Sequence, residues 1–357
     1  MSLPTIALED LPLLPYAQYI SYLDVKSLIQ LSRNQDSTKE LIQLLGLESG
    51  GYHISIRQNL LELRIPSRNH YQWHNDSDKD GLICTMHDVL DELKSVLPGN
   101  LDHLKIDPDL SSHFSYFNHQ CTVLSIGSNT YEYSPTKVES MGPLENLDEL
   151  LNKVQFEKGL ALNGPKELKT ENPRIFRIDW LQIRNSSWIT SEFLRKLQNK
   201  VIYLTDAWSL TDQDLNEFLR DLKDGKINNP NLQMIRFGRY GGWDKSAVLE
   251  GLEVTEQRDQ IFKFPDFDKR VKTEKFLPRE FTDDGVMKIE ESCDFTRNDG
   301  IKCSIQFSWN SVRIFVWNPV QTQVEKKTKK KRAAKKRATK KRRNTDSVNG
   351  PTAKRSC

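Results

Sequence analysis

The chain has 357 residues, 37% of them hydrophobic, and a polar mean hydropathy of −0.63. That length is enough to bury one sizeable core and a smaller one. No apolar run approaches the ~18 residues of a membrane-spanning helix, and five scattered cysteines match neither a disulfide framework nor a zinc site. The sequence therefore excludes a membrane-spanning protein and a disulfide-stapled secreted domain, and predicts a protein of the cytosol or nucleus.

Charge is distributed unevenly along the chain. Residues 325–357 carry 15 Lys or Arg and 2 Asp or Glu, a net charge of +13, whereas the whole chain carries +3. The first 324 residues therefore carry −10. The sequence predicts an acidic folded body followed by a basic tail, residues 319–357, which lacks apolar periodicity and should be disordered.

Residues 8–47 are predicted to form a compact helical unit. Leucine and isoleucine recur there at spacings of three to five, which favours several short helices. Asp24 is a suitable N-cap for a helix over residues 25–31, because its carboxylate can accept hydrogen bonds from the free N–H groups of the first turn. A unit of about 40 residues has little interior of its own, so it should pack against a partner or the next domain.

Beyond residue 52, short strands and helices are predicted to alternate. Strands are expected over 52–56, 60–65, 101–106, 121–126, 178–183, 201–206 and 232–237, and helices over 85–97, 145–154, 190–197 and 211–225. Thr190 and Thr211 stand at N-cap positions, and Asp214 completes a variant of the capping box. The later strands follow one another at intervals of about 20 to 32 residues, which is typical of a leucine-rich-repeat-like βα solenoid.

The last part of the body is predicted to be a β-hairpin with a third strand. Residues 287–297 and 302–309 flank Asn298-Asp299-Gly300, a strong turn signal because glycine tolerates positive φ. Residues 312–317 follow as the third strand. The predicted fold class is thus α+β or α/β: a three-helix unit, an irregular leucine-rich-repeat-like βα domain ending in a hairpin, and a disordered basic tail.

Three segments together resemble one protein family. Leu11-Pro12, Leu23-Asp24 and Leu31-Ser32 stand where an F-box of the nematode-expanded family has the same residue pairs. Residues 189–237 resemble the F-box-associated type 2 domain of that family, with its core at Leu210 to Leu219 and its strand entry at Pro230. Residues 295–305 and 312–317 are similar to the terminal hairpin. The resemblance covers residues 10–318.

The resemblance implies a function and a domain division. It implies an F-box at 8–47, an F-box-associated type 2 domain at 52–318, and a substrate-recognition subunit of an SCF-type cullin–RING ubiquitin ligase. Such a protein has no enzymatic activity and needs no cofactor; its F-box binds a Skp-type adaptor and its second domain binds a protein target. The implied adaptor contacts are Leu11, Pro12, Ile20, Leu23, Leu28 and Leu31. The alternative is that these side chains fill the core of the unit itself, although Leu11-Pro12 precedes the helices and should lie exposed.

Aromatic residues are the candidates for target binding, since Trp and Tyr are enriched at binding hot spots. The chain offers Trp180, Trp188, Trp208, Tyr240 and Trp243. Tyr240 and Trp243 flank two glycines, which indicates an exposed loop, so this pair is predicted to contact the target. For each of these residues, core packing is the alternative.

No catalytic or metal-binding motif is found in the sequence. It contains no glycine-rich phosphate loop, no nucleophile elbow and no His-Glu-x-x-His. His113, His119 and Cys121 lack a fourth ligand and have no known metal spacing. The sequence therefore predicts neither an enzyme nor a metal site.

The basic tail is not explained by the resemblance. Its clusters are Lys329, Lys330, Lys331, Arg332, Lys335, Lys336, Arg337, Lys340, Lys341, Arg342 and Arg343. Exposed clusters of this kind act as importin-binding nuclear localisation signals, which predicts a nuclear protein with the cytoplasm as a further location. They also bind nucleic-acid phosphates without sequence preference, so the alternative function is a nuclear nucleic-acid-binding protein with a degenerate F-box. A third interpretation is that the tail rests on the acidic body at low salt.

Overall fold

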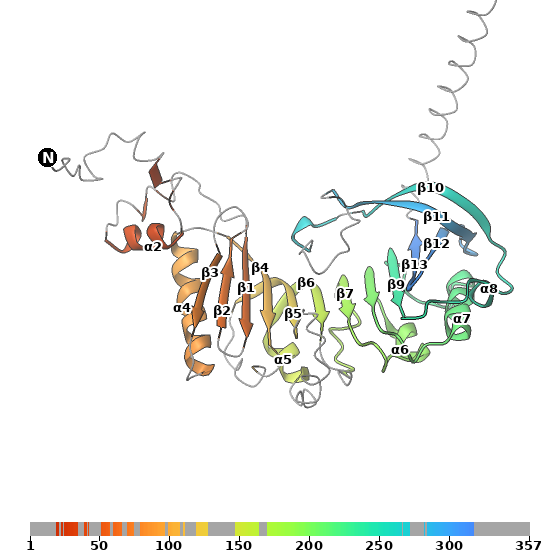
Figure 1. The fold of residues 1–357 in the computed structure, drawn as a ribbon, viewed down its shortest axis with the longest axis horizontal. Helices are drawn as coiled ribbons and strands as arrows, with labels where there is room; N and C mark the ends of the chain where they lie inside the picture. Colours follow the sequence, from red (N-terminus) through yellow and green to blue (C-terminus); the bar gives the residue numbers. More distant parts are fainter. Residues whose placement is uncertain are drawn as a thin grey trace, which may run out of the picture.

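The computed structural model of the protein describes residues 19–20, 23, 25–34, 39–40, 42, 51–57, 60–65, 70–74, 79–96, 99–107, 110, 119–127, 147–163, 170–265, 267–271, 282 and 284–317. These residues form one mixed sheet of 13 strands with helices against one of its faces (Figure 1). The strand order is β10-β11-β12-β13-β9-β8-β7-β6-β5-β4-β1-β2-β3. The strands from Tyr52 to Val316 therefore belong to one continuously hydrogen-bonded sheet.

The middle of the sheet is parallel and both of its ends are antiparallel. The parallel strands are β1 (Tyr52–Arg57), β4 (Leu101–Ile106), β5 (Gln120–Ile126), β6 (Gln155–Leu162), β7 (Trp180–Ile183), β8 (Val201–Leu204) and β9 (Met234–Gly238). One antiparallel end consists of β2 (Leu60–Arg64) and β3 (His70–His74). The other consists of β13 (Ser311–Val316), β12 (Lys302–Ser308), β11 (Val286–Thr296) and β10 (Thr255–Lys263).

The two faces of the sheet bury two separate hydrophobic clusters, because successive side chains of a strand point to opposite faces. On β8, Ile202 and Leu204 face the helices and belong to the larger cluster. The described helices are α2 (Val25–Asn34), α4 (Lys79–Val96), α5 (Leu147–Lys153), α6 (Ser191–Lys196), α7 (Asp212–Lys223) and α8 (Lys245–Val248), with a 3₁₀ turn at Lys269–Val271. On the same strand β8, Val201 and Tyr203 face away from these helices and belong to the second cluster.

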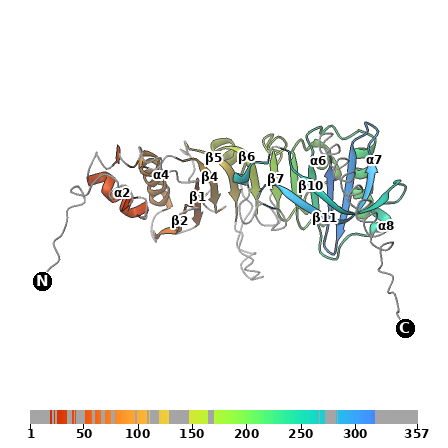
Figure 2. The ribbon, with the colours of Figure 1, turned by 90° about the horizontal axis from the view of Figure 1, so that it is seen from above.

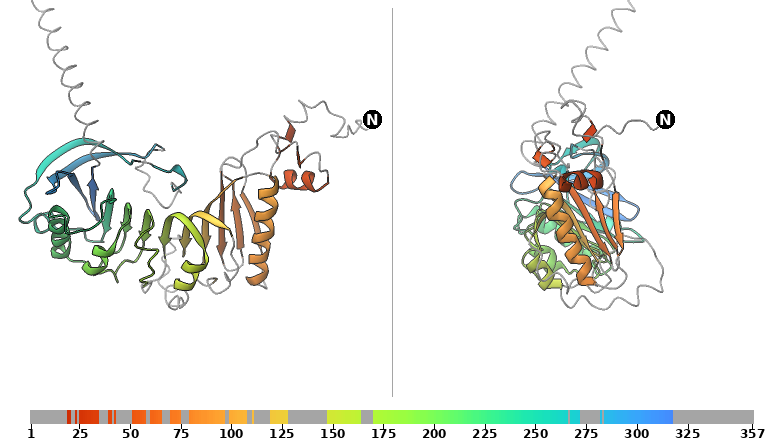
Figure 3. Two further views of the ribbon diagram at one scale, coloured as in Figure 1. Left: turned by 180° about the vertical axis from the view of Figure 1, so that it is seen from behind. Right: turned by 90° about the vertical axis from the view of Figure 1, so that its left-hand side faces the viewer.

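The second cluster forms because β10 and β11 arch over the face of the parallel strands (Figures 1 and 3). Seen from above, this long hairpin passes across the sheet (Figure 2). Its apolar side chains, among them Phe262 and Ile289, pack with Trp180, Met234 and Trp317. Within β10, Asp259 leaves the extended conformation with a φ of 54°, between the pairs Arg258–Glu291 and Gln260–Ile289. The hairpin thus covers apolar surface that helices leave open.

The predicted fold class is wrong. The described part of the chain is mostly one large mixed sheet with antiparallel strands at both ends, rather than a three-helix F-box followed by a leucine-rich-repeat-like domain. Within residues 8–47, α2 is the one helix whose bounds are described, and it packs against α4. Ile20 and Leu28 are fully buried in the same core as the sheet. A small helical unit gains stability by sharing the core of its neighbour, which explains why no separate unit is seen among the described residues.

Most predicted elements are nevertheless present, with ends that differ by a few residues. The two predicted N-caps among the described residues are confirmed: Thr190 accepts a hydrogen bond from the backbone of Phe193, and Thr211 forms a full capping box with Asp214. Strands β3, β6 and β10 and helix α8 were not predicted. Asp24 and residues 319–357 lie outside the described residues.

Buried asparagines fix the turns that enter the last three parallel strands. Asn172, Asn199 and Asn229 precede β7, β8 and β9 and are all buried. The Asn199 Nδ2 donates to the carbonyl oxygens of Ile175 (2.7 Å) and Ile178 (2.6 Å), and the Asn229 Nδ2 donates to the Asn199 carbonyl (2.9 Å). Each amide supplies hydrogen bonds to backbone groups that water does not reach, so one turn holds the next.

A buried histidine makes stability depend on pH. His119 lies beside His87, with ring centroids 5.1 Å apart, and its Nδ1 is 3.0 Å from the Lys94 ammonium. Burial lowers the pKa of His119 from its ordinary 6.5, and the nearby positive charges of Lys94 and His87 lower it further, while Asp91 opposes them. Burial also lowers the pKa of His87, against the carboxylates of Asp91 and Asp88.

Acid should therefore destabilise the protein in a defined pH window. Because both histidines hold protons less tightly in the folded state, their stabilising contribution is present above pH 6.5 and is lost as pH falls through the lowered pKa values. Urea unfolding of the full chain at pH 7.5 and 5.5 should show this loss. His119→Gln should reduce the difference between the two pH values, and an unchanged difference would contradict the assignment.

Candidate protein-binding surface

Three exposed aromatic side chains lie together at one edge of the sheet. Trp208 is 55% exposed, Tyr240 71% and Trp309 74%. The ring centroid of Tyr240 is 6.4 Å from that of Trp208 and 6.3 Å from that of Trp309, so the rings form a continuous set. Trp208, Tyr240 and Trp309 together form the aromatic patch. Exposed clusters of large aromatic side chains are rare in water-facing surfaces without a binding role.

The patch is assembled from three loops that the sheet brings together. Trp208 follows β8 and Tyr240 follows β9, and the carboxyl ends of parallel neighbours meet at one edge. Trp309 lies in the two-residue turn between β12 and β13, and β13 is antiparallel to β9 with Ser311 opposite Gly238. The sheet order therefore places Tyr240 and Trp309 side by side although 69 positions of sequence separate them.

Arg239 ties the three loops to one another. Its backbone N–H donates to the Asn310 carbonyl (2.9 Å) in the β12–β13 turn. Its guanidinium donates to the carbonyls of Leu210 (3.1 Å) and Gly242 (2.9 Å) and to the carboxylate of Asp212 (2.7 Å). The loops that carry the patch are thus fixed before any partner arrives, which lowers the entropic cost of binding.

Gly242 allows a close approach between two of these loops. It has a φ of 75°, and a Cβ at this position would lie 2.6 Å from the backbone oxygen of Trp309. Only glycine takes that conformation at that distance without strain. The contact keeps the Tyr240 turn pressed against the turn that carries Trp309.

The loops around the patch are acidic. Residues 205–215 and 239–244 contain Asp206, Asp212, Asp214 and Asp244 but one cation, Arg239, a net charge of −3. Burial would raise the pKa of Asp214, but hydrogen bonds from Ser191 and Thr211 hold that pKa below its usual value. Asp244 caps α8, and its backbone N–H donates to Asp212 (3.2 Å). The carboxylate of Asp206 makes no ion pair with another described residue.

The predicted target contacts Tyr240 and Trp243 differ in accessibility. Tyr240 belongs to the aromatic patch, whereas Trp243 is half-buried, stacks under the Arg239 guanidinium at 4.0 Å and packs on Phe237. Trp180 is buried in the second cluster and Trp188 packs on Phe193. Core packing therefore accounts for these three tryptophans.

Trp309 was missed as a candidate. It was predicted as the last residue of the strand 302–309, and its sequence signal is a tryptophan where that strand gives way to the next one at residue 312. A two-residue hairpin turn leaves little room to bury so large a side chain, so the position itself indicates exposure.

The implied adaptor contacts fall into three groups. Ile20 and Leu28 are fully buried, so neither side chain is accessible to a partner in this structure. Leu23 and Leu31 are half-buried, and Leu23 packs against the main core. Leu11 and Pro12 lie outside the described residues, as do the basic clusters of residues 329–343.

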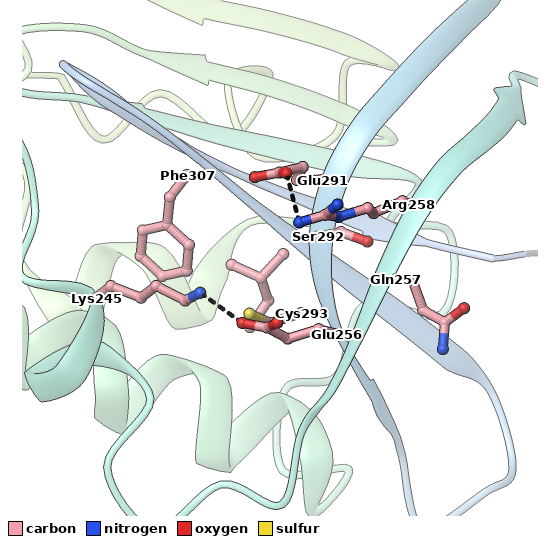
Figure 4. Close-up of a pocket in the computed structure, with 9 residues that line it drawn as sticks. Lys245, Glu256, Gln257, Arg258, Glu291, Ser292, Cys293 and Phe307 are labelled. Atoms are coloured by element: carbon pink, nitrogen blue, oxygen red, sulfur yellow. Dashed lines mark hydrogen bonds and ion pairs between the residues drawn. The ribbon is translucent and has the colours of Figure 1, made fainter.

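A small pocket lies between α8 and the strands β10, β11 and β12 (Figure 4). Its volume is about 90 Å³, which suits a few water molecules. The charged side chains that line it are paired, Lys245 with Glu256 (3.2 Å) and Arg258 with Glu291 (3.2 Å). Burial raises the pKa of the Cys293 thiol, which opposes the thiolate that a nucleophile requires.

Among the described residues, no group of three or more His, Cys, Asp or Glu side chains is placed to hold a metal ion. His119 and Cys121, considered as ligands above, are both buried, and burial raises the pKa of Cys121 to about 12. No described helix is both long and apolar enough to cross a membrane.

Comparison of the chain with models of protein families, with curated proteins and with solved structures gives no match.

Proposed function

We propose that this chain is a non-enzymatic recognition subunit of a cullin–RING ubiquitin ligase and that the aromatic patch holds its protein target. The observation that carries the second part is the exposure of Trp208, Tyr240 and Trp309 on loops fixed by Arg239. The first part is supported by the resemblance of three segments within residues 10–318 to one F-box protein family. The two parts are therefore tested separately.

The patch has the properties of a binding hot spot. Large aromatic side chains bury much apolar area at a small cost in side-chain entropy. Exposed rings do little for the free chain, so their truncation should hardly change its stability. Their truncation should instead remove much of the binding energy, since a few central aromatic residues dominate most interfaces.

Proximity labelling in cells tests the target surface. Trp309→Ala combined with Tyr240→Ala should remove the target proteins from the labelled set, because truncation of a hot spot weakens binding by about 2 kcal/mol or about thirtyfold per residue. Ile261→Ala is the matched control: Ile261 is 51% exposed but lies on β10, outside the aromatic patch. Equal labelling by the wild type and the double variant would contradict the proposed target surface.

Adaptor binding is tested in the full chain by co-purification with the Skp-type adaptor. Leu11→Ala with Pro12→Ala should abolish co-purification, because the resemblance implies adaptor contacts at these two residues, whereas Ile20 and Leu28 are buried in the main core. Ile261→Ala should leave co-purification unchanged. Adaptor binding by neither the wild type nor the control would refute the ligase assignment and leave the target surface untouched.

A second candidate function follows from the +13 charge of residues 325–357. A basic tail of this kind would bind nucleic acid through phosphate contacts and direct the chain to the nucleus. Deleting residues 326–343 should move the protein to the cytoplasm. DNA binding that depends on the tail, in a chain that binds no adaptor, would favour this candidate.

A further inference from the structure

The aromatic patch combines two features that attract the same kind of ligand. The faces of Trp and Tyr rings attract the cationic groups of Lys and Arg. The surrounding carboxylates of Asp206, Asp212 and Asp244 add negative charge that one arginine offsets in part. A neutral apolar partner would use the rings and leave the carboxylates desolvated, which is unfavourable. The surface therefore fits a segment rich in Lys or Arg.

The chain itself contains such a segment. Residues 326–343 hold 13 Lys or Arg among 18 residues and no acidic or aromatic residue. Lysine and arginine side chains can lay their apolar stems along a ring and keep the charged group near a carboxylate. The charge of this segment is complementary to that of the loops around the patch.

The segment is also tethered within reach of the patch. β13 runs from Ser311, opposite Gly238 beside the patch, to Val316 at the far end of the strand. Six residues of strand span about 20 Å. Residues 318–325 can span about 27 Å when extended, so every basic cluster can return to the patch. A short tether gives an effective concentration of about millimolar, which makes even weak contacts count.

We infer that residues 326–343 dock on the aromatic patch and cover the surface that the proposed function assigns to the target. This inference concerns the same surface as the proposed function, but tail docking does not require that the patch binds a target. A target must then displace the tail, so binding of an importin or of nucleic acid to the tail would expose the patch. Recognition of the target would then depend on whether an importin or nucleic acid is bound to the tail.

The test uses a synthetic peptide of residues 326–343 and the intrinsic fluorescence of the tryptophans. The peptide should bind a chain that ends at residue 325 and should bind the full chain at least about tenfold more weakly, because the attached tail competes. Trp309→Ala and Tyr240→Ala in the shortened chain should each weaken peptide binding about tenfold, read by calorimetry. Ile261→Ala should change the affinity less than about twofold.

Charge variants separate docking on the patch from general attraction. Asp206→Asn and Asp244→Asn remove the two charges; asparagine tolerates the φ of 56° at position 206 and caps α8 as aspartate does. The double variant should weaken binding about tenfold at 50 mM salt, and less at 300 mM salt where screening is stronger. Equal affinities for Trp309→Ala, Ile261→Ala and the parent would overturn the inference, as would equal binding of the peptide to the full and shortened chains.

The outcomes distinguish this inference from the proposed function. If the patch variants bind the peptide as tightly as the parent does, while Trp309→Ala with Tyr240→Ala still removes the labelled targets, the inference fails and the proposed target surface stands. If the patch variants bind the peptide more weakly but label the same targets as the wild type, the proposed target surface fails and tail docking stands. If the experiments support both tail docking and the target surface, deletion of residues 326–343 from the chain with an unmutated patch should increase the labelling of target proteins.

Discussion

Replacing Asn199 by alanine should lower the free energy of unfolding of the full chain by about 3 kcal/mol. The Asn199 side chain is fully buried, and its Nδ2 donates to the carbonyls of Ile175 and Ile178 at 2.7 and 2.6 Å. Alanine leaves both carbonyls without this donor in a place that water does not reach, and each lost partner costs about 1 to 3 kcal/mol. Urea unfolding followed by circular dichroism measures the change.

Asn231→Ala is the matched control for this prediction. Asn231 lies in the turn that enters β9, but its side chain is exposed, and the described contact is made by its backbone N–H to the Asn229 Oδ1. Its replacement should change the free energy of unfolding by less than about 0.5 kcal/mol. Similar losses for Asn199→Ala and Asn231→Ala would show that the buried amide does not hold the turns together.

Gly242→Ala should destabilise the protein by about 3 kcal/mol and separate the Tyr240 loop from Trp309. The methyl group would lie 2.6 Å from the Trp309 backbone oxygen, and the φ of 75° is itself strained for any residue with a Cβ. The backbone of one loop must therefore move. Urea unfolding measures the stability, and calorimetry with the tail peptide should show weaker binding because the patch loses its geometry.

Gly241→Ala separates the two physical causes. Gly241 also has a positive φ, of 86°, but a Cβ there would meet no atom within 4 Å. Its replacement should cost about 1 kcal/mol from backbone strain alone and leave the patch intact. If both alanine variants lose the same stability, the close approach to Trp309 contributes nothing.

Local features of the fold were predictable from the sequence. Thr211 and Asp214 cap α7 as expected, and Asn298-Asp299-Gly300 forms the turn between β11 and β12. These features depend on side chains that contact their own neighbours along the chain. The missed strand β6 has three polar residues, Gln155, Glu157 and Lys158, among its first four, and this polar start hides the apolar residues Leu160 to Leu162 that the core requires.

The candidate site was predictable in part. Tyr240 was expected to lie exposed beside two glycines, and it does. Trp243 was grouped with it, but the stacking of Arg239 on its ring covers it. Arg239 decides which aromatic side chain of this loop faces water, because it stacks on Trp243 and bonds to two other loops. The spacing of residues in the sequence does not reveal these contacts.

By itself the sequence determined the acidic body, the basic tail, the caps and turns, and most of the strands and helices. The tertiary structure decided that these strands join one mixed sheet, that β10 and β11 cover its second face, and that α2 shares the main core. It also decided the aromatic patch, because Trp208, Tyr240 and Trp309 meet only where β8, β9 and β13 are neighbours. Caps and turns arise from interactions over a few residues, whereas strand order follows from burying apolar faces that lie far apart in the chain.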